Sequence, residues 1–353
     1  MGEVAVGNRQ WLLRQRPTGR LRVSDFEYRV DTSPQRPLLD GEVRFRSLAF
    51  RCSPTMRNWM QPPGKNLFPS MTLGQPVMAS SAGVVVESAN SAWRVGDRVQ
   101  EVTAAWEDVS ILSPGAFRFA SPIAADTTYL DSMGRYGLNA MTAYFGLLKV
   151  GRPISGETLV VSAAAGSTGS VAAQIGKLLG LTVIGIAGGA QKCRWLTETC
   201  GLDGAIDYKS EDVEARLGEL APGGIDVFYD NVGGPILEAA VTNIARGGRI
   251  VLCGQIAGYD TAPAGVARLD MMRLVYGSVR MEGFLFGNYL HMIPEALEDL
   301  RSWTQTGRLH HREHLHERFE DLPEALISLF EGRNDGTVLV AAHEAAHTTG
   351  VDF

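Results

Sequence analysis

An alternation of strand-like and helical segments, which begins near Leu138 and fills the middle of the chain, constrains the fold more than any other feature of this sequence. Right-handed crossovers wind such a series into a parallel sheet with helices on both faces. The strand-like runs lie at residues 157–161, 181–186, 205–207, 225–230, 249–253 and 279–284. The sequence therefore predicts an α/β fold with a doubly wound parallel sheet.

The turn after the first of these strands carries a glycine pattern typical of nucleotide binding. Residues 163–169 read Ala-Ala-Ala-Gly-Ser-Thr-Gly, an AxxGxxG variant of the dinucleotide fingerprint, and an apolar helix follows. Gly166 and Gly169, with Thr168 between them, let the backbone approach a pyrophosphate at the positive end of that helix. A glycine pair alone is weak evidence, but this one lies between a strand and a helix and opens a βαβ series. We therefore expect a Rossmann domain that binds a dinucleotide.

The end of the second strand distinguishes NADPH from NADH. A domain that binds NAD places Asp or Glu there to accept the ribose 2′-hydroxyl, whereas residues 187–192 read Ala-Gly-Gly-Ala-Gln-Lys and hold no acid. Gly189 leaves room for a phosphate, Lys192 supplies positive charge, and Tyr208 after the third strand adds a hydroxyl. Charge-assisted hydrogen bonds contribute about 1.5–3 kcal/mol each, which favours NADPH. The alternative, that Lys192 is only a solvated residue at a helix start, stays open.

The N-terminal third predicts an irregular, mostly β domain. Residues 41–46, 83–87 and 96–99 read as short strands and turns, in a region punctuated by prolines. Strand-like pattern returns at 337–340, near the C-terminus. We therefore expect a β domain of residues 1–134 that residues 305–353 complete, and a Rossmann domain of residues 135–304.

Charge and cysteine usage argue against several classes of protein. With 33 basic and 39 acidic residues the formal net charge is −6, which does not suit a partner made of nucleic acid or an anionic membrane surface. No apolar run approaches the ~20 residues of a membrane span, and we expect no signal peptide. The four cysteines are scattered and form no CxxC pair, which disfavours a disulfide framework or a structural zinc and suits the cytoplasm.

Seven short motifs, spread over nearly the whole chain, together resemble one branch of the medium-chain dehydrogenase/reductase superfamily. This zinc-independent branch holds prostaglandin reductases, leukotriene B4 dehydrogenases, curcumin reductases and alkenal double-bond reductases. The motifs NRQW, MRNWM, MTAYFG, GGAQKC, IDYK, YDNVGG and MEGF lie at residues 8–11, 56–60, 141–146, 188–193, 206–209, 229–234 and 281–284. The resemblance implies a GroES-like first domain, NADPH as the cofactor, a small-molecule substrate and a homodimer.

The resemblance also implies which residues bind the cofactor. Lys192 and Tyr208 hold the 2′-phosphate, Asn231 meets the adenosine half or its ribose, and Thr142 faces the nicotinamide. The remaining contacts come from three segments: the loop 253–259 with Cys253, Gly254, Ile256 and Tyr259; the backbone of Phe284, Leu285 and Phe286; and Asn334 in the returning C-terminal segment.

Three positions depart from the family pattern near the expected substrate mouth. Asn58 replaces the glycine of a Met-Arg-Gly motif, Thr55 stands where relatives often carry tyrosine, and Ser53 replaces the aspartate of an Asp-Pro step. These departures leave the substrate open. The loop 62–69 is rich in glycine and proline, and one hypothesis is that it orders over the substrate.

The residues available as metal ligands limit which reaction the chain can catalyse. Residues 1–290 contain no histidine, and Cys52 is the one cysteine of the N-terminal domain, so the ligands of an alcohol-dehydrogenase zinc are missing. Hydride transfer to a conjugated C=C bond is then easier than to an isolated ketone, because the charge spreads to the carbonyl oxygen as an enolate. Its position in the family makes Tyr259 the candidate donor to that oxygen, and a phenol donates while neutral. Tyr259 could equally do no more than cover the cofactor, and a ribose hydroxyl of the cofactor or water could supply the donor or the proton.

We therefore expect NADPH-dependent reduction of the C=C bond of α,β-unsaturated ketones or aldehydes, without a metal. The first alternative is an NADPH:quinone oxidoreductase, which differs in its acceptor. The second is a non-catalytic NADPH-binding protein, which would bind the cofactor without turnover. The histidine-rich segment 310–316 is interpreted as solvated surface rather than a metal site.

Overall fold

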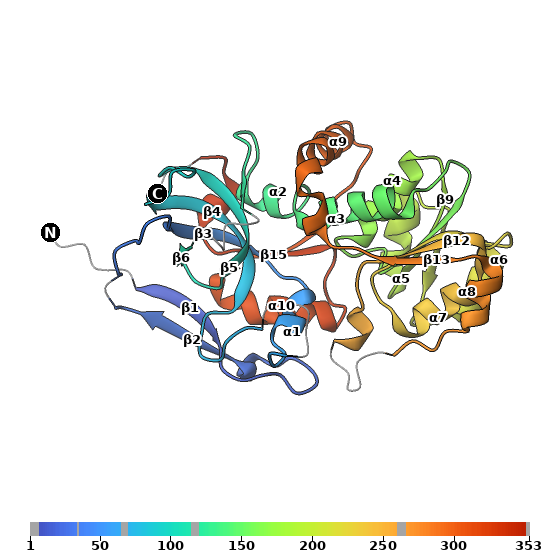
Figure 1. The fold of residues 1–353 in the computed structure, drawn as a ribbon, viewed down its shortest axis with the longest axis horizontal. Helices are drawn as coiled ribbons and strands as arrows, with labels where there is room; N and C mark the ends of the chain where they lie inside the picture. Colours follow the sequence, from blue (N-terminus) through green and yellow to red (C-terminus); the bar gives the residue numbers. More distant parts are fainter. Residues whose placement is uncertain (1–6, 34, 65–69, 114–119, 260–265, 351–353) are drawn as a thin grey trace. The chain divides into compact units, whose positions relative to one another are not determined.

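The computed structural model describes residues 7–33, 35–64, 70–113, 120–259 and 266–350, and it divides into two compact units. The first unit comprises residues 1–134, 314–334 and 338–353; the second comprises 135–313 and 335–337. The chain therefore leaves the second unit at residue 314 and revisits it for three residues near the C-terminus. Figure 1 shows the chain coloured from its N-terminus to its C-terminus.

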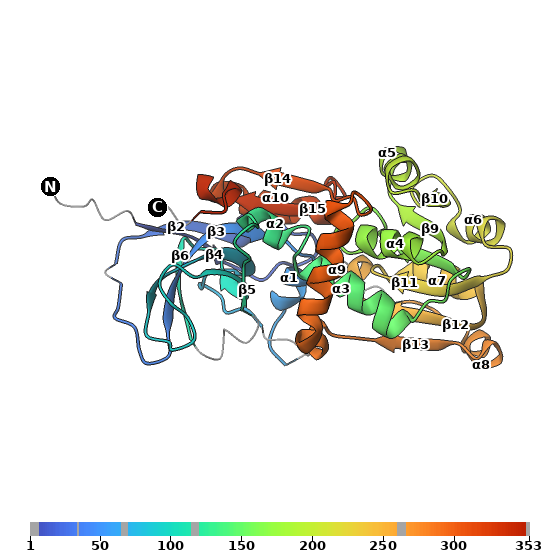
Figure 2. The ribbon, with the colours of Figure 1, turned by 90° about the horizontal axis from the view of Figure 1, so that it is seen from above.

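The second unit is built on a six-stranded sheet in which every neighbouring pair of strands is parallel. Its order is β10-β9-β8-β11-β12-β13, and Figure 2 labels β10, β9, β11, β12 and β13 in this order. The strands are β8 (Thr158–Ser162), β9 (Thr182–Ala187), β10 (Gly204–Asp207), β11 (Ile225–Asp230), β12 (Ile244–Leu252) and β13 (Arg280–Gly283). The predicted doubly wound parallel sheet is confirmed. The strand order reverses between β8 and β11, which is where ligands of such sheets bind.

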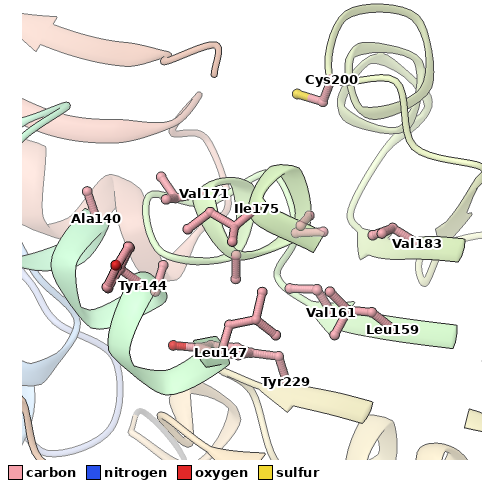
Figure 3. Packing of buried hydrophobic residues seen from close by; sticks show 14 of the residues in the cluster. Ala140, Tyr144, Leu147, Leu159, Val161, Val171, Ile175, Val183, Cys200 and Tyr229 are labelled. Carbon is pink, nitrogen blue, oxygen red and sulfur yellow. The ribbon is translucent and has the colours of Figure 1, made fainter. Parts of the chain in front are cut away.

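Helices cover both faces of this sheet because alternate strand residues point to opposite sides. Leu159 and Val161 pack with α4 in one apolar cluster, and Val160 between them packs with α6 and α7 in another. Figure 3 shows Val161 and Val183 of the strands facing Val171 and Ile175 of α4. The helices are α3 (Leu138–Phe145), α4 (Gly169–Leu178), α5 (Ala190–Arg194), α6 (Val213–Leu220), α7 (Gly234–Thr242), α8 (Met271–Gly277) and α9 (Ile293–Gln305).

The first unit is an irregular, mostly antiparallel β structure, as predicted. Its larger sheet has the order β14-β15-β3-β4-β5-β7, with β6 also paired to β3, and β1 pairs with β2 separately. Its strands are β1 (Asn8–Leu13), β2 (Phe26–Asp31), β3 (Val43–Arg51), β4 (Met78–Ser88), β5 (Arg98–Ala105), β6 (Val109–Leu112), β7 (Ser121–Pro122), β14 (Glu313–His316) and β15 (Thr337–Ala341). The helices α1 (Thr55–Trp59), α2 (Tyr129–Met133) and α10 (Leu322–Phe330) complete it.

The C-terminal segment enters this larger sheet through β15, which pairs antiparallel with β3. Within the described residues, no helix combines the length and apolar character that crossing a membrane requires. Of the loop 62–69, residues 65–69 lie outside the described part of the chain, so its ordering over a substrate stays a hypothesis.

Candidate active site

The turn after β8 is so tight at Gly169 that no side chain fits there. Ala163 adopts a positive φ of 49°, and the N–H of Gly166 donates to the Ala163 carbonyl oxygen at 2.9 Å. A Cβ on Gly169 would lie 2.3 Å from that same oxygen, much closer than real Cβ contacts. The helix α4 therefore begins directly after this loop, at Gly169. Helix N-termini leave N–H groups without intrahelical partners, so this turn suits a phosphate.

Hydrogen bonds tie the carboxyl ends of β8 and β11 together at the point where the strand order reverses. The Ser162 hydroxyl donates to Asp230 Oδ1 at 2.8 Å and accepts from the Asn231 N–H at 2.8 Å. The Asn231 side-chain amide donates to the Ser162 carbonyl, also at 2.8 Å. Burial raises the pKa of Asp230, and hydrogen bonds from the backbone N–H groups of the following loop oppose this. Asn231 therefore holds the shape of this edge; its role toward the adenosine half stays a prediction.

The loop after β12 is fastened to the same place by its backbone. The N–H groups of Cys253 and Gly254 donate to the Asp230 carbonyl oxygen at 2.8 and 3.1 Å, and that of Ile256 donates to the Asn231 carbonyl oxygen at 3.3 Å. Burial raises the pKa of the Cys253 thiol to about 11, so this cysteine is neutral near pH 7 and is no nucleophile. The structure therefore brings the predicted residues 231 and 253–256 together.

Tyr259 closes this loop and is half-buried. Its hydroxyl oxygen lies 3.5 Å from the backbone nitrogen of Gln255, a long contact in which the hydroxyl accepts. This contact does not use the hydroxyl proton. Tyr259 can therefore donate a hydrogen bond to a substrate oxygen, which is the chemistry expected of it.

The residues predicted for the nicotinamide side gather around Gly146, just after α3. The Thr142 carbonyl accepts a hydrogen bond of 3.1 Å from the buried Tyr229 hydroxyl, and the Thr142 hydroxyl donates to its own helix. A Cβ on Gly146 would lie 2.5 Å from the Phe284 ring and 2.6 Å from the Tyr229 hydroxyl, so both side chains press on this glycine. Thr142 and Phe284 are thus neighbours across Tyr229.

The two residues after Phe284 differ in exposure. Leu285 is 54% exposed, whereas the Phe286 ring packs with its centroid 6.2 Å from that of Phe145 on α3. The packed rings anchor this segment, and the Leu285 side chain next to Phe286 is exposed. This arrangement agrees with a segment that offers backbone groups to a ligand.

The glycines after β9 make room for Tyr208. A Cβ on Gly188 would lie 2.8–2.9 Å from three atoms of the Tyr208 side chain, so the tyrosine rests directly on this glycine. Gly189 has a φ of 99°, and its N–H donates to Asp207 Oδ1 at 2.7 Å. The acid at the end of β10 therefore shapes the turn and is already engaged by the backbone.

Lys192, in the following helix α5, is half-buried among other charges. Burial lowers the pKa of Lys192; the Asp335 carboxylate opposes this, and the cations Lys209 and Arg312 lower the pKa further. A partly desolvated cation next to like charges gains most from a nearby anion. The site therefore suits a phosphate dianion.

Two of these charges, Arg312 and Asp335, were missed by sequence reasoning. Arg312 belongs to the histidine-rich segment 310–316, and the prediction of a solvated surface is wrong for His311. The His311 side chain is only 5% exposed, and burial lowers its pKa to about 4. Within the described residues, no group of three or more His, Cys, Asp or Glu is arranged to hold a metal ion. No local sequence pattern predicted that residues 335–337 return to the second unit.

The predicted cofactor residues divide between the two units as follows. Asn334 belongs to the first unit, directly before the three residues that return to the second. All the others lie in the second unit: Thr142, Gly166, Thr168, Gly169, Gly189, Lys192, Tyr208, Asn231, Cys253, Gly254, Ile256, Tyr259, Phe284, Leu285 and Phe286.

Comparison with known proteins agrees with this geometry. Residues 167–302 match the family described as zinc-binding dehydrogenase, and residues 9–118 match the N-terminal domain of oxidoreductase. The NADPH-dependent curcumin reductase of Escherichia coli is 33% identical over 347 residues, which cover 96% of this chain and 98% of that protein. The NADP(+)-dependent 2-alkenal reductase of Nicotiana tabacum is 35% identical over 338 residues, covering 95% and 97% of the two chains.

Comparison with solved structures indicates the same family. CurA from Vibrio vulnificus superposes with a TM-score of 0.87 at 33% identity, over 96% of this chain and 99% of that one. The structure of the same protein in complex with NADPH has a TM-score of 0.86 at 34% identity, over 95% and 99%. The chain belongs to the medium-chain dehydrogenase/reductase superfamily, in the branch of the curcumin, prostaglandin and alkenal reductases.

Proposed function

We propose that this protein reduces the C=C bond of α,β-unsaturated ketones or aldehydes by transferring hydride from NADPH to the β-carbon, after which a proton from solvent adds to the α-carbon. The observation that carries the cofactor choice is the cationic site around Lys192 after β9, where an NAD-binding domain has an acid. Relatives named as curcumin reductase, 2-alkenal reductase and prostaglandin reductase 1 support the enone substrate class.

The residues present fit NADPH. The space that a Cβ would fill at Gly169, the neighbouring Gly166 and Thr168, and the N-terminus of α4 suit the pyrophosphate. Lys192 and Tyr208, beside the positive-φ turn at Gly189, suit the 2′-phosphate. When bound, NADPH supplies the hydride.

The chain's own residues then orient the reactants and stabilise charge. Thr142 and the segment from Phe284 to Phe286 hold the nicotinamide end, with the loop 253–256 on the switch-point side. Tyr259 donates a hydrogen bond to the carbonyl oxygen of the substrate, where negative charge grows as the β-carbon is reduced. The neutral thiol of Cys253 keeps this surface free of competing charge.

Replacement of Tyr259 by phenylalanine is expected to lower kcat by roughly 10²-fold, the usual cost of removing one donor to a developing oxyanion. The dissociation constant of NADPH should change little, because the ring that covers the cofactor remains. Stopped-flow turnover and fluorescence titration measure the two quantities. Tyr276→Phe, which alters a tyrosine that is 78% exposed, is the control. An unchanged kcat would mean that Tyr259 only covers the cofactor.

The direct test of the function follows NADPH and NADH oxidation with 2-alkenals, aryl enones, quinones and saturated ketones, and checks the mass of each product. Turnover of enones with NADPH and a gain of two hydrogens at the C=C bond is expected. Activity confined to quinones would favour the quinone oxidoreductase alternative. Tight NADPH binding without turnover of any acceptor would favour the non-catalytic one.

We also infer a homodimer, for which the edge of the six-stranded sheet is the candidate interface. Strand β13 ends the sheet, and the neighbouring α8 exposes Met271, Val275 and Tyr276 at 61%, 63% and 78%. An unpaired edge beside an exposed apolar patch is typical of a surface that a partner covers.

The double substitution Val275→Glu with Met271→Glu is expected to convert the dimer into a monomer in light scattering after gel filtration. Two charges in an apolar interface are costly unless they find partners. Ile154→Glu, at a residue of the same unit that is 66% exposed, should leave the dimer intact. An unchanged dimer in the double variant would place the interface elsewhere.

The four cysteines are free, which supports a reducing compartment such as the cytoplasm.

A further inference from the structure

Two distant segments of the chain meet beside the glycine turn of the second unit. Gln174 of α4 holds His310 through both backbone groups: its Oε1 accepts from the His310 N–H at 2.7 Å, and its Nε2 donates to the His310 carbonyl at 2.9 Å. Gly336 forms a parallel bridge with Gly166. The segments 310–312 and 335–337 are therefore attached to the nucleotide turn and to the helix that follows it.

Gly336 also fixes the position of Arg312. The Thr337 N–H donates to the Arg312 carbonyl oxygen at 2.9 Å, and a Cβ on Gly336 would lie 2.0 Å from that oxygen. Since Gly336 contacts Gly166 on one side and Arg312 on the other, the backbone of Arg312 is only one residue away from the nucleotide turn. The arginine is held there by the main chain, independently of its side chain.

The guanidinium of Arg312 is held by an ion pair, but not all of its N–H donors have an acceptor among the described residues. Its Nη2 lies 2.5 Å from Asp335 Oδ2, and its Cζ lies 5.3 Å from the centre of the Trp195 ring. Its Nη1 is buried and, within the part of the chain that the structure describes, has no hydrogen-bond partner; the same holds for Asp335 Oδ1. The side chain is 27% exposed. One edge of a positioned guanidinium is therefore left for another acceptor.

The charge around this group is predominantly positive. Lys209 and Arg312 both act on Lys192, and Asp335 is the acid that opposes them. Asp207 is engaged by the N–H groups of Gly189 and Lys209. The positive charges near Lys192 disfavour its charged form until an anion joins them. A phosphate dianion would satisfy them better than a single carboxylate.

We propose that Arg312 is a third contact for the 2′-phosphate of the cofactor, beside Lys192 and Tyr208. The planar guanidinium offers paired N–H donors to a phosphate, which a lysine ammonium does not. The ligand class is a 2′-phosphorylated adenine nucleotide. This inference rests on the proposed function for its ligand and deepens it by naming a specificity residue.

The test is calorimetric titration with 2′,5′-ADP and with 5′-AMP, which differ in the phosphate on the 2′ position. Arg312→Met is expected to weaken 2′,5′-ADP binding by about tenfold or more, the size of a lost charge-assisted hydrogen bond, and 5′-AMP binding by less than about twofold. Arg194→Met is the matched control, because Arg194 is an exposed cation on α5 two residues from Lys192. It should leave the ratio of the two affinities unchanged.

A second variant separates recognition from structural support. Asp335→Asn breaks the same ion pair but keeps the arginine, so 2′,5′-ADP binding should stay at least as strong as in the wild type. If Arg312→Met and Asp335→Asn weaken both nucleotides equally, the pair only supports the fold and the proposal is overturned. Arg312→Lys keeps a charge without the paired donors; should the methionine variant not fold, an intermediate loss of 2′,5′-ADP affinity supports the proposal and an unchanged affinity overturns it.

The outcomes also distinguish this inference from the proposed function. A wild-type protein that binds 2′,5′-ADP no more tightly than 5′-AMP contradicts the NADPH assignment itself. A wild-type protein that prefers 2′,5′-ADP, with the same preference in Arg312→Met, contradicts only the role of Arg312.

Discussion

Replacement of Gly169 by alanine is expected to destabilise the second unit by several kcal/mol and to remove measurable NADPH binding. The added Cβ would lie 2.3 Å from the Ala163 carbonyl oxygen, 2.9 Å from the Ala163 carbonyl carbon and 3.0 Å from the Ala164 Cα. All three atoms belong to the backbone, so no side chain can move away. Overpacking of this kind costs about 1–3 kcal/mol or more, and the helix start would move with the turn. Thermal unfolding and NADPH fluorescence titration measure the two effects.

Gly166→Ala is the matched control for this prediction. A Cβ at Gly166 would lie 3.1 Å from the same carbonyl oxygen, which a shift of a few tenths of an ångström relieves. The melting temperature should therefore stay near that of the wild type, while NADPH binding weakens because the backbone can no longer approach the pyrophosphate as closely. If Gly169→Ala melts at the wild-type temperature, the close approach at this turn does not determine the structure.

The parts of the fold that the sequence predicted are those whose signals lie in consecutive residues. The strand before Ala163, the glycine at 169 and the apolar helix after it interact over a few residues, so their pattern survives in the sequence. The six strands were predicted because parallel strands buried on both faces read as apolar runs. Their parallel pairing followed from the helices between them.

The parts that the sequence did not predict depend on distant segments that meet only in the folded chain. Arg312 and Asp335 form an ion pair because Gly336 bridges to Gly166, and none of these contacts has a local pattern. The histidines around Arg312 led instead to the question of a metal site or a solvated surface, and the sequence was interpreted as the latter. Burial of His311 decides against the second interpretation at that position, and only the folded structure supplies this burial.

The cofactor site itself was predicted in part for the same reason. Gly189 and Lys192 follow β9 directly, and Tyr208 follows β10 in a recognisable motif, so the local sequence alone led to the prediction of all three. That Tyr208 rests on Gly188 explains why glycine stands there, a reason that the sequence alone did not give. The roles of these three residues toward the cofactor stay predictions, as do those of Tyr259 and Asn334.

Replacement of Lys192 by methionine is expected to weaken NADPH binding by roughly tenfold to a hundredfold, the cost of one charge-assisted hydrogen bond to the 2′-phosphate. NADH binding should change by less than about twofold, because NADH has no charge at that position. The methionine keeps most of the apolar stem of the half-buried lysine, so the fold should be retained. Lys177→Met, which removes a lysine of α4 that pairs with Asp203 at 2.6 Å, is the control.

The pH dependence gives an independent check with a definite sign. Because burial lowers the pKa of Lys192, this lysine loses its proton at a lower pH than an exposed lysine does. The preference for NADPH over NADH should therefore fall as the pH rises into the alkaline range in the wild type, and should depend less on pH in Lys192→Met. Bound phosphate favours the charged ammonium and moves the transition to higher pH, so binding has to be measured at low cofactor occupancy. Equal weakening of NADPH and NADH in Lys192→Met would assign this lysine to the fold of α5 and leave the choice of cofactor to its neighbours.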